Sequence, residues 1–230
     1  MRTINCADES RSRRTRSGAA TFGEILTLAL SICAFLVATA AYLRARADAP
    51  AAATALRHLD DWAQLSSTGH RLGTTNATKS ILVFEDYQCP FCKIMHGTLK
   101  RMRAANPDIV VISRQFPLTS THPHAMAAAI AAECASDQGR FEQFQDTVYS
   151  AQSQIGSVTW AEFANRSGVP DAPRFAKCVA SDTGIRRRVQ RDLDAALEHQ
   201  LPGTPAIIVA GDLLTSPSDS LILRLLKRAK

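Results

Sequence analysis

Aromatic residues are scarce in this sequence, at 6% of 230 residues, and no cluster of Lys and Arg is interleaved with them. Proteins that bind nucleic acid typically present such a basic surface, so we do not expect that function here. The formal net charge of +6 does not change this conclusion, because five arginines fall within residues 1–24 and the rest is dispersed. Charged residues make up only 21% of the chain beside 46% hydrophobic residues, which excludes a disordered chain and predicts one ordinary domain with appendages.

Charge is absent altogether from Ile25 to Leu43, a run of 19 residues. A helix of this length crosses the core of a bilayer, whereas the apolar region of a signal peptide is usually shorter. We therefore favour an uncleaved transmembrane anchor over a cleaved signal or a buried soluble helix. Five arginines precede the run and only Arg44 and Arg46 follow it closely, which predicts a cytoplasmic amino terminus. The rest of the chain is then expected in the periplasm or another extracytoplasmic space.

Cysteine is rare as well, with six residues in the chain. Two of them, Cys6 and Cys33, lie in the basic tail and in the apolar run. An even number of thiols outside the cytoplasm indicates an oxidising compartment. The four cysteines that follow the run are Cys89, Cys92, Cys134 and Cys178.

The segment Cys89-Pro90-Phe91-Cys92 lies between an apolar run and a predicted helix from Lys93 to Ala105. Two cysteines on the first turn of a helix can close a disulfide, and the positive end of the helix dipole favours a thiolate on the first. The same spacing also serves half of a zinc site. We expect neither metal nor cofactor, because the other cysteines are not spaced as a second half and His122-Pro123-His124 is no closed site.

Cys134 and Cys178 lie on two different predicted helices, 44 residues apart. With the other two paired locally, these two cysteines either bridge each other or stay buried as thiols. An oxidising compartment favours the bridge. Closing a loop of this size would stabilise the fold by roughly 3–4 kcal/mol.

Strands are predicted from Ile81 to Glu85 and from Asp108 to Phe116, with the helix between them. This is a βαβ unit, in which the two strands run parallel. A long helical stretch follows before Thr204-Pro205 opens another strand, where a cis peptide bond would explain a proline at this position. The chain is therefore predicted to divide into a basic tail at 1–24, the anchor at 25–43, a connecting region at 44–79 and a domain at 80–230. The connecting region contains a linker at 48–54 and a packing helix at 56–65. The domain contains a helical insertion at about 118–200.

Two titratable residues flank the cysteine pair. Glu85 either relays protons for the buried thiol or is a solvated loop carboxylate, and the second interpretation is favoured on the sequence alone. His96 lies one turn beyond Cys92 and is expected to face solvent.

These features jointly resemble the thioredoxin superfamily, and the helical insertion makes the chain similar to the DsbA-like thiol:disulfide oxidoreductases. The resemblance covers about Ser80 to Lys230 and is carried by FEDYQCPFCK, QFPLTSTHPHAMAAAIAAECA, QGRFEQFQDTVY and GTPAIIVAG. It implies an α/β fold of the thioredoxin type. The residues that match the motifs are Cys89 as nucleophile, Cys92 as resolving cysteine, Pro90 and Phe91 as the pair that tunes the potential, Pro205 as the cis-proline, and Thr204 beside the active disulfide.

One position departs from the resemblance. Family members often carry a buried acid six residues before the first cysteine, where this chain has Val83. Glu85 lies two residues further on and shares the same strand face if the strand is straight. Proton transfer to the buried thiol is therefore expected either to use Glu85 as a relay, to use water, or to be slow.

The resemblance implies a thiol:disulfide oxidoreductase acting on cysteine-containing extracytoplasmic proteins, more as an oxidase than as a reductase, and recycled by a membrane redox partner. Because Pro-Phe supplies no histidine in the turn, the couple is expected to be less oxidising than that of DsbA. No dimerisation module is evident, so a monomer is expected. The alternative is a redox-inert, membrane-tethered thioredoxin-like module that binds peptides or a partner protein.

Overall fold

The computed structural model describes residues 22–47, 57–215 and 217–228. The chain forms two compact units, Met1–Ala53 and Thr54–Lys230. Most of the tail predicted at 1–24 and the linker predicted at 48–54 lie outside the described residues.

The described part of the first unit is helix α1, Phe22–Ala47. Its segment Ile25–Tyr42 has a mean hydropathy of 2.2, and none of this segment is buried. By length and composition, α1 is a candidate membrane span, in agreement with the predicted apolar run.

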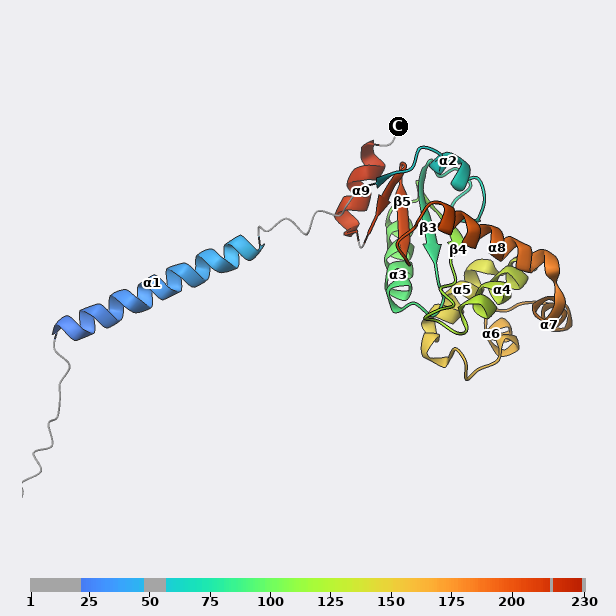
Figure 1. The fold of residues 1–230 in the computed structure, drawn as a ribbon, viewed down its shortest axis with the longest axis horizontal. Coiled ribbons are helices and arrows are strands. Elements are labelled where there is room, and N and C mark those ends of the chain that lie inside the picture. Colours follow the sequence, from blue (N-terminus) through green and yellow to red (C-terminus); the bar gives the residue numbers. More distant parts are fainter. Residues whose placement is uncertain (1–21, 48–56, 216, 229–230) are drawn as a thin grey trace, which may run out of the picture. The chain divides into compact units, whose positions relative to one another are not determined.

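A mixed sheet forms the centre of the second unit, with the order β1-β6-β5-β3-β4-β2 (Figure 1). The parallel pair β3 and β4 is joined through helix α3, and β5 pairs with β3 in the antiparallel sense. The predicted βαβ unit and the α/β class are confirmed. The strands are β1 (Arg57–His58), β2 (His70–Leu72), β3 (Lys79–Glu85), β4 (Ile109–Gln115), β5 (Ala206–Val209) and β6 (Asp212–Leu214).

Alternate residues of β3 face two separate cores. Ile81 and Val83 join the core that includes α3 (Pro90–Ala105) and α9 (Asp219–Arg228), whereas Leu82 and Phe84 join the core on the other face. This is the period of two that a strand imposes on its side chains. A strand that is apolar on both faces needs helices to cover both of its faces. Packing on both sides therefore holds β3 in place just before the cysteine pair.

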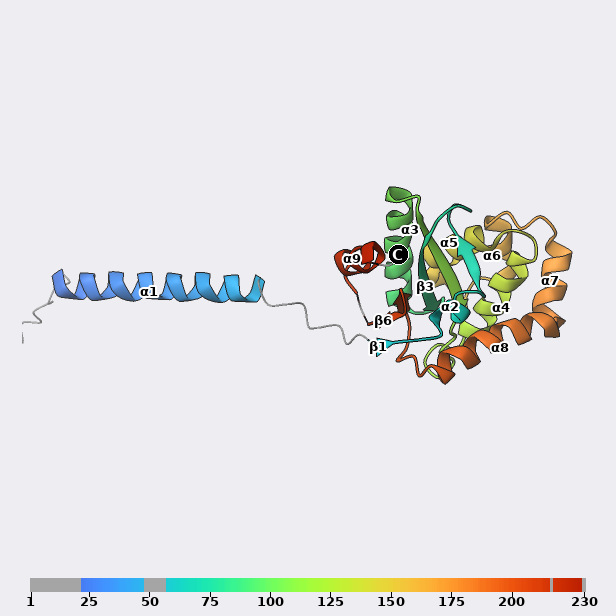
Figure 2. The ribbon, with the colours of Figure 1, turned by 90° about the horizontal axis from the view of Figure 1, so that it is seen from above.

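Helices cover both faces of the sheet. The first core contains residues of α3 and α9, and the second contains residues of α2 (Trp62–Leu65) and α8 (Thr183–Glu198). Figure 2 shows α3 and α9 on one side of the strands and α8 on the other.

The segment between β4 and β5 is helical, and α4 packs against α5, α7 and α8. α4 is rich in alanine, and most of its residues are buried. A disulfide between Cys134 and Cys178 joins α4 to α7, with the two Cα atoms 5.9 Å apart. The helices and the short 3-10 turn η1 that precede α8 here are α4 (Ala125–Ser136), α5 (Phe141–Ser150), η1 (Gln152–Gln154), α6 (Trp160–Arg166) and α7 (Ala172–Ser181).

The packing helix predicted from Leu56 to Leu65 is wrong. Of the residues of this stretch that the structure describes, 57–65, only the last four form a helix, α2, while Arg57 and His58 form β1. The reason is a tertiary contact, because Arg57 and His58 pair with Leu213 and Asp212 of β6. Strand pairing with a distant segment overrides a local helical pattern.

Candidate active site

Cys89 occupies the N-cap position of α3. The strand β3 ends at Glu85, and a short turn closed by the bond from Cys89 N–H to Asp86 O (3.1 Å) leads into the helix. Pro90 takes the first helical position, where its missing N–H costs nothing. Cys89 therefore presents its sulfur to the unpaired N–H groups and the positive dipole end of α3.

The Cys89 thiol is unusually acidic, with a pKa lowered to about 5. The hydrogen bond from Cys92 is the main cause, followed by the Thr204 side chain and the backbone N–H groups of Cys92 and Phe91, while burial opposes the shift. The Thr204 hydroxyl is buried and bonds no other group among the described residues, so it is available to the thiolate. These donors stabilise the ionised sulfur.

Cys92 has the opposite character. Its exposed fraction is 1% against 4% for Cys89, so Cys89 is the sulfur that a partner can reach more readily. Burial, first, and the neighbouring Cys89 raise the pKa of Cys92 well above its usual range. Its sulfur accepts the Asp86 N–H at 3.4 Å. Both cysteines are free thiols, so this is the dithiol form.

Thr204 and Pro205 lie beside the cysteine pair, joined by a cis peptide bond. The Cys89 thiol donates to the Thr204 carbonyl at 3.3 Å. The antiparallel pairing of Phe84 with Ala206 brings the start of β5 next to the end of β3, which explains this proximity. The sheet thus joins two sites separated by more than a hundred residues of sequence.

Glu85 is buried, at 4% exposed, so the interpretation as a solvated loop carboxylate is wrong. One carboxylate oxygen accepts from Ser113 and Gln145, and the other accepts from the Tyr149 hydroxyl at 2.9 Å. Burial raises the pKa of Glu85, and His96 and these donors oppose the rise. Glu85 also raises the pKa of Cys92, so the two groups interact electrostatically.

Asp86 fixes the turn that precedes Cys89. Its buried carboxylate accepts from the backbone N–H groups of Gln88 (2.7 Å) and Leu118 (2.8 Å) and bonds His122 Nδ1 (2.9 Å). His122 therefore has a structural contact, and the adjacent His124 is the N-cap residue of α4. Among the described residues, no group of three or more His, Cys, Asp or Glu is arranged to hold a metal ion.

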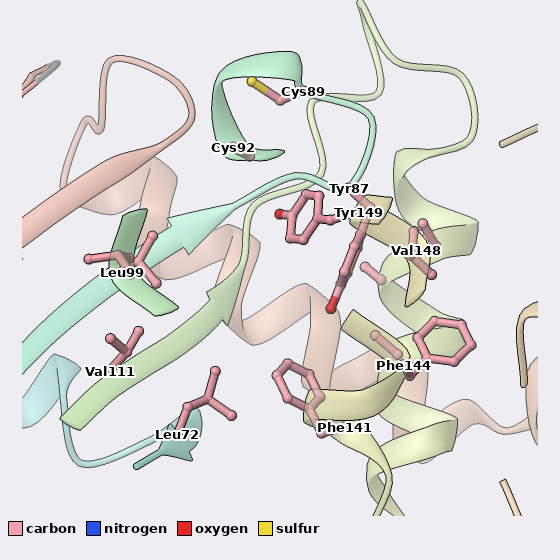
Figure 3. Close-up of a cluster of buried hydrophobic side chains, with 14 of the residues drawn as sticks. Leu72, Tyr87, Cys89, Cys92, Leu99, Val111, Phe141, Phe144, Val148 and Tyr149 are labelled. Atoms are coloured by element: carbon pink, nitrogen blue, oxygen red, sulfur yellow. The ribbon is translucent and has the colours of Figure 1, made fainter. Parts of the chain in front are cut away.

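Several residues of the helical insertion support the turn, and the sequence analysis did not identify them. Gln152 donates to the carbonyls of Tyr87 (2.8 Å) and Cys89 (2.9 Å). Tyr87 and Tyr149 pack against each other at 5.2 Å and lie below the turn (Figure 3). The only sign of these residues in the sequence was a polar side chain within an otherwise apolar segment. Such a side chain does not show which group it bonds in the fold.

His96 does not face solvent as predicted. Its side chain is 14% exposed, and its Nε2 bonds Asp146 Oδ1 at 2.7 Å. The ring packs against that of Tyr149, with 4.8 Å between the centroids and the planes tilted by 32°. Contacts with α5 explain the error, because the sequence around α3 alone cannot show which side of the helix α5 covers.

The outer surface near Cys89 is apolar. Phe91 is 69% exposed and Ile94 is 66% exposed, and both lie on the first two turns of α3. A separate cavity of about 560 Å³ lies between α2 and α8, and its lining includes Arg114, Asp192 and His199. No residue of the cysteine pair or the Thr204-Pro205 segment lines this cavity.

The family model described as Thioredoxin matches residues 65–227, more than half of the chain. The chain belongs to the thioredoxin family. The predicted thioredoxin-like fold with a helical insertion, preceded by one candidate membrane helix, is therefore confirmed.

Solved structures with this fold include oxidoreductases. A thioredoxin-like oxidoreductase from Silicibacter pomeroyi DSS-3 has 19% identity and a TM-score of 0.62, covering 74% of this chain and 97% of that one. DsbA2 of Pseudomonas aeruginosa has 24% identity and a TM-score of 0.54, covering 70% and 93%. At these identities the likeness shows the fold, which is DsbA-like as the sequence motifs predicted.

A curated relative is the Na⁺/H⁺ antiporter NhaA 3 of Salinispora tropica, which is 30% identical over 142 residues. The match covers 62% of this chain but only 22% of the antiporter. The thioredoxin-family chain described here thus corresponds to about a fifth of that protein.

Proposed function

We propose that this thioredoxin-family chain is a membrane-anchored thiol:disulfide oxidoreductase that acts on cysteines of extracytoplasmic proteins through Cys89 and Cys92. The observation that carries the proposal is the opposite acidity of the two thiols, with a pKa of about 5 at Cys89 and a raised pKa at Cys92. Thiol–disulfide exchange requires a stable thiolate as nucleophile and leaving group, and a second thiol held nearby in reserve.

In the oxidising direction, a substrate thiolate attacks Cys89 Sγ of the Cys89–Cys92 disulfide. The bond between the two enzyme sulfurs breaks, a bond between Cys89 and the substrate forms, and Cys92 takes up a proton. A second substrate thiolate then attacks the substrate sulfur, and Cys89 leaves as a thiolate. The substrate loses two electrons to the enzyme, which ends as the dithiol.

The peptide substrate is expected to lie along Thr204. Pro205 has no N–H and β5 begins only at Ala206, so the backbone of Thr204 lies outside the strand ladder of β5. An extended segment can pair with such a stretch of backbone through main-chain hydrogen bonds. The exposed Phe91 and Ile94 offer apolar contact on the other side of Cys89.

The acidity of the Cys89 thiol bears on whether the enzyme oxidises or reduces its substrates. The corresponding pKa is about 3.5 in DsbA and about 7 in thioredoxin, whose potentials are about −120 and −270 mV. A stabilised thiolate favours the reduced enzyme and makes its disulfide a stronger oxidant. A pKa of about 5 supports an oxidase that is weaker than DsbA, with a potential between these two values.

The assignment to a compartment and to partners is part of the same proposal. The anchor at 25–43 would hold the catalytic domain at 80–230 on the outer side of the bacterial inner membrane, as a single-pass monomer. A dithiol produced in each cycle needs an oxidant, so a membrane redox partner would recycle the Cys89–Cys92 pair.

The test uses the detergent-solubilised full chain. After mild reduction, we expect selective alkylation of Cys89 at pH 6, catalysis of disulfide formation in a reduced, unfolded protein, and a glutathione equilibrium that gives a potential between those of thioredoxin and DsbA. The Cys89→Ser variant should lose all three properties, while Cys33→Ser should keep them.

A wild-type chain with neither selective alkylation nor activity towards thiols and disulfides would refute the proposal and leave the redox-inert binding module. A potential at or above that of DsbA would contradict the predicted weaker oxidant.

A further inference from the structure

In the proposed function, the buried thiol of Cys92 exchanges a proton in each catalytic cycle. Glu85 is a buried acid at the end of β3, just before the turn that leads to the two cysteines. Both side chains are almost completely inaccessible, at 1% for Cys92 and 4% for Glu85. The Tyr149 hydroxyl donates to Glu85 and lies 3.4 Å from the Asp86 carbonyl, while the Asp86 N–H reaches Cys92 Sγ. A proton that reaches Glu85 still needs a route to solvent.

A small cavity connects Glu85 to the neighbouring helices. Its volume is about 10 Å³, close to the smallest space that holds one water molecule. Glu85 and His96 both line it. The remaining lining residues are Leu72, Val83, Leu99, Lys100, Arg103, Val111 and Gln145.

His96 is oriented for proton transfer. Its Nε2 bonds the Asp146 carboxylate at 2.7 Å, which fixes the proton of the neutral ring on that nitrogen. Nδ1 makes no hydrogen bond to any described residue and can accept a proton. The Asp146 side chain is 31% exposed, so the far side of this pair reaches the surface.

The other charged residues at the cavity are unsuited to this role. The side chains of Lys100 and Arg103 are hydrogen-bond donors without an acceptor atom, so they cannot take up a proton from Glu85. They are also engaged, Lys100 with Asp146 and Arg103 with Glu142. The titratable and charged groups that contact His96 or line the same cavity are Glu85 from β3, Lys100 and Arg103 from α3, and Asp146 and Tyr149 from α5.

We propose that His96, held by Asp146, carries the proton between Glu85 and solvent when Cys92 resolves a mixed disulfide on Cys89. In that step Cys92 Sγ attacks Cys89 Sγ and gives its proton to the Glu85 carboxylate. The bond from Cys89 to the partner sulfur breaks, and the partner leaves as a thiolate with the electron pair. The proton passes from Glu85 through the cavity to His96 Nδ1 and from the ring to solvent.

The inference rests on the proposed function, and its test follows the lifetime of the mixed disulfide. The reduced, detergent-solubilised full chain is mixed with oxidised glutathione and quenched with acid, and the Cys89–glutathione adduct is quantified by mass spectrometry. The series covers pH 5 to 8 in H₂O and D₂O. The variants are His96→Gln, Asp146→Asn and, as matched control, His199→Gln, whose ring bonds Asp61 far from this cavity.

We expect His96→Gln to lengthen the adduct lifetime about tenfold at pH 7, a part of the 10²–10⁴-fold that positioned proton transfer typically supplies. The dependence of the resolution rate on pH should become weaker than in wild type, and the solvent isotope effect should increase. Asp146→Asn should slow resolution about threefold, since the ring keeps its place but loses its fixed tautomer. His199→Gln should behave as wild type.

Resolution at the wild-type rate in both His96→Gln and Asp146→Asn would overturn the inference. Slower resolution with an unchanged pH profile and isotope effect would also overturn it, because only packing would then have changed. A wild-type chain that forms no adduct at Cys89 would instead refute the proposed function.

Discussion

At the scale of single residues, the site depends on two sulfurs in adjacent but different surroundings. Cys89 caps α3 beside Cys92 and the Thr204 hydroxyl, which both lower its pKa, whereas Cys92 points into the core against the Asp86 N–H. The same hydrogen bond between the sulfurs stabilises the Cys89 thiolate and keeps the proton on Cys92. Removing either donor therefore alters the acidity of Cys89 in a predictable direction.

Thiolates absorb ultraviolet light near 240 nm, and this absorbance can be followed as the pH of the reduced protein is raised. We expect the absorbance of the Cys89 thiolate to appear with a midpoint at a pH of about 5. The midpoint should rise in Cys92→Ala, because the bond from Cys92 is the largest cause of the low pKa. Thr204→Val should raise it less, while Thr204→Ser keeps the hydroxyl and serves as control. An equal midpoint in wild type and Cys92→Ala would contradict the assignment.

The raised pKa of Glu85 predicts how stability depends on pH. The folded state favours the protonated carboxyl, so this contribution to stability is complete below the unfolded pKa of about 4.3 and is lost as pH rises through the folded pKa. Glu85→Gln removes the ionisation and should stabilise the protein at pH 8 by about 1 kcal/mol, with little effect at pH 4.

Thermal unfolding at the two pH values measures this difference. The control is Glu162→Gln on α6, whose carboxylate is exposed and bonds only Arg166. A Glu85→Gln variant that is less stable at pH 8 than at pH 4, each relative to wild type, would show that the buried carboxylate is stabilised as an anion.

The cysteine spacing and the proline before β5 could be predicted because both are local features of the sequence. The burial of Glu85 could not, since Gln145 and Tyr149 come from α5, 60 and 64 residues further along the chain. His96 was assigned to solvent for the same reason, because its partner Asp146 also lies on α5. Residue roles that depend on contacts across the helical insertion are invisible to local patterns.

At the scale of elements, the helix that follows the cysteine pair was predicted to within a few residues. α3 ends at Ala105 as predicted and begins at Pro90, three residues before the predicted start at Lys93. The predicted bounds of the two central strands differ from those of β3 and β4 by one or two residues. Strand ends depend on the last hydrogen bond formed with a neighbouring strand, which the sequence does not show. β1 was missed because two residues carry no periodicity, and only their pairing with β6 makes them a strand.

The disulfide between α4 and α7 gives a prediction at this scale. Replacing both Cys134 and Cys178 by alanine should lower stability by about 3–4 kcal/mol, because the 44-residue loop is no longer closed in the unfolded chain. For a protein of this size this corresponds to a fall in Tm of about 10 °C. The potential of the Cys89–Cys92 couple should not change.

Thermal unfolding and the glutathione equilibrium measure the two quantities separately. Cys33→Ala, in α1, is the matched control for loss of a cysteine outside the folded unit. An unchanged Tm in the double variant, or a shifted potential, would contradict a purely structural role for this disulfide.

At the scale of the whole molecule, a candidate membrane helix precedes a unit that contains both a disulfide and a dithiol. Structural disulfides persist in oxidising compartments and are rare in the cytoplasm. The disulfide and the arginine excess before the apolar run therefore point to the same topology by independent physical arguments.

Thiol trapping in intact bacterial cells tests that topology. In the full chain, Cys134 and Cys178 should resist a maleimide reagent unless the protein is first reduced, because the proposed topology puts the folded unit outside the cytoplasm and the two cysteines are bridged. A variant that lacks residues 1–43 should stay in the cytoplasm with both thiols free to react, and it should lose the same 3–4 kcal/mol as the double alanine variant. Replacing Arg11, Arg13, Arg14 and Arg16 by alanine removes most of the charge bias, so part of the population should invert and expose these thiols to the reducing cytoplasm. Full reactivity of Cys134 and Cys178 in the unaltered chain would mean that the unit faces the cytoplasm, where Cys89 and Cys92 could not act as an oxidase.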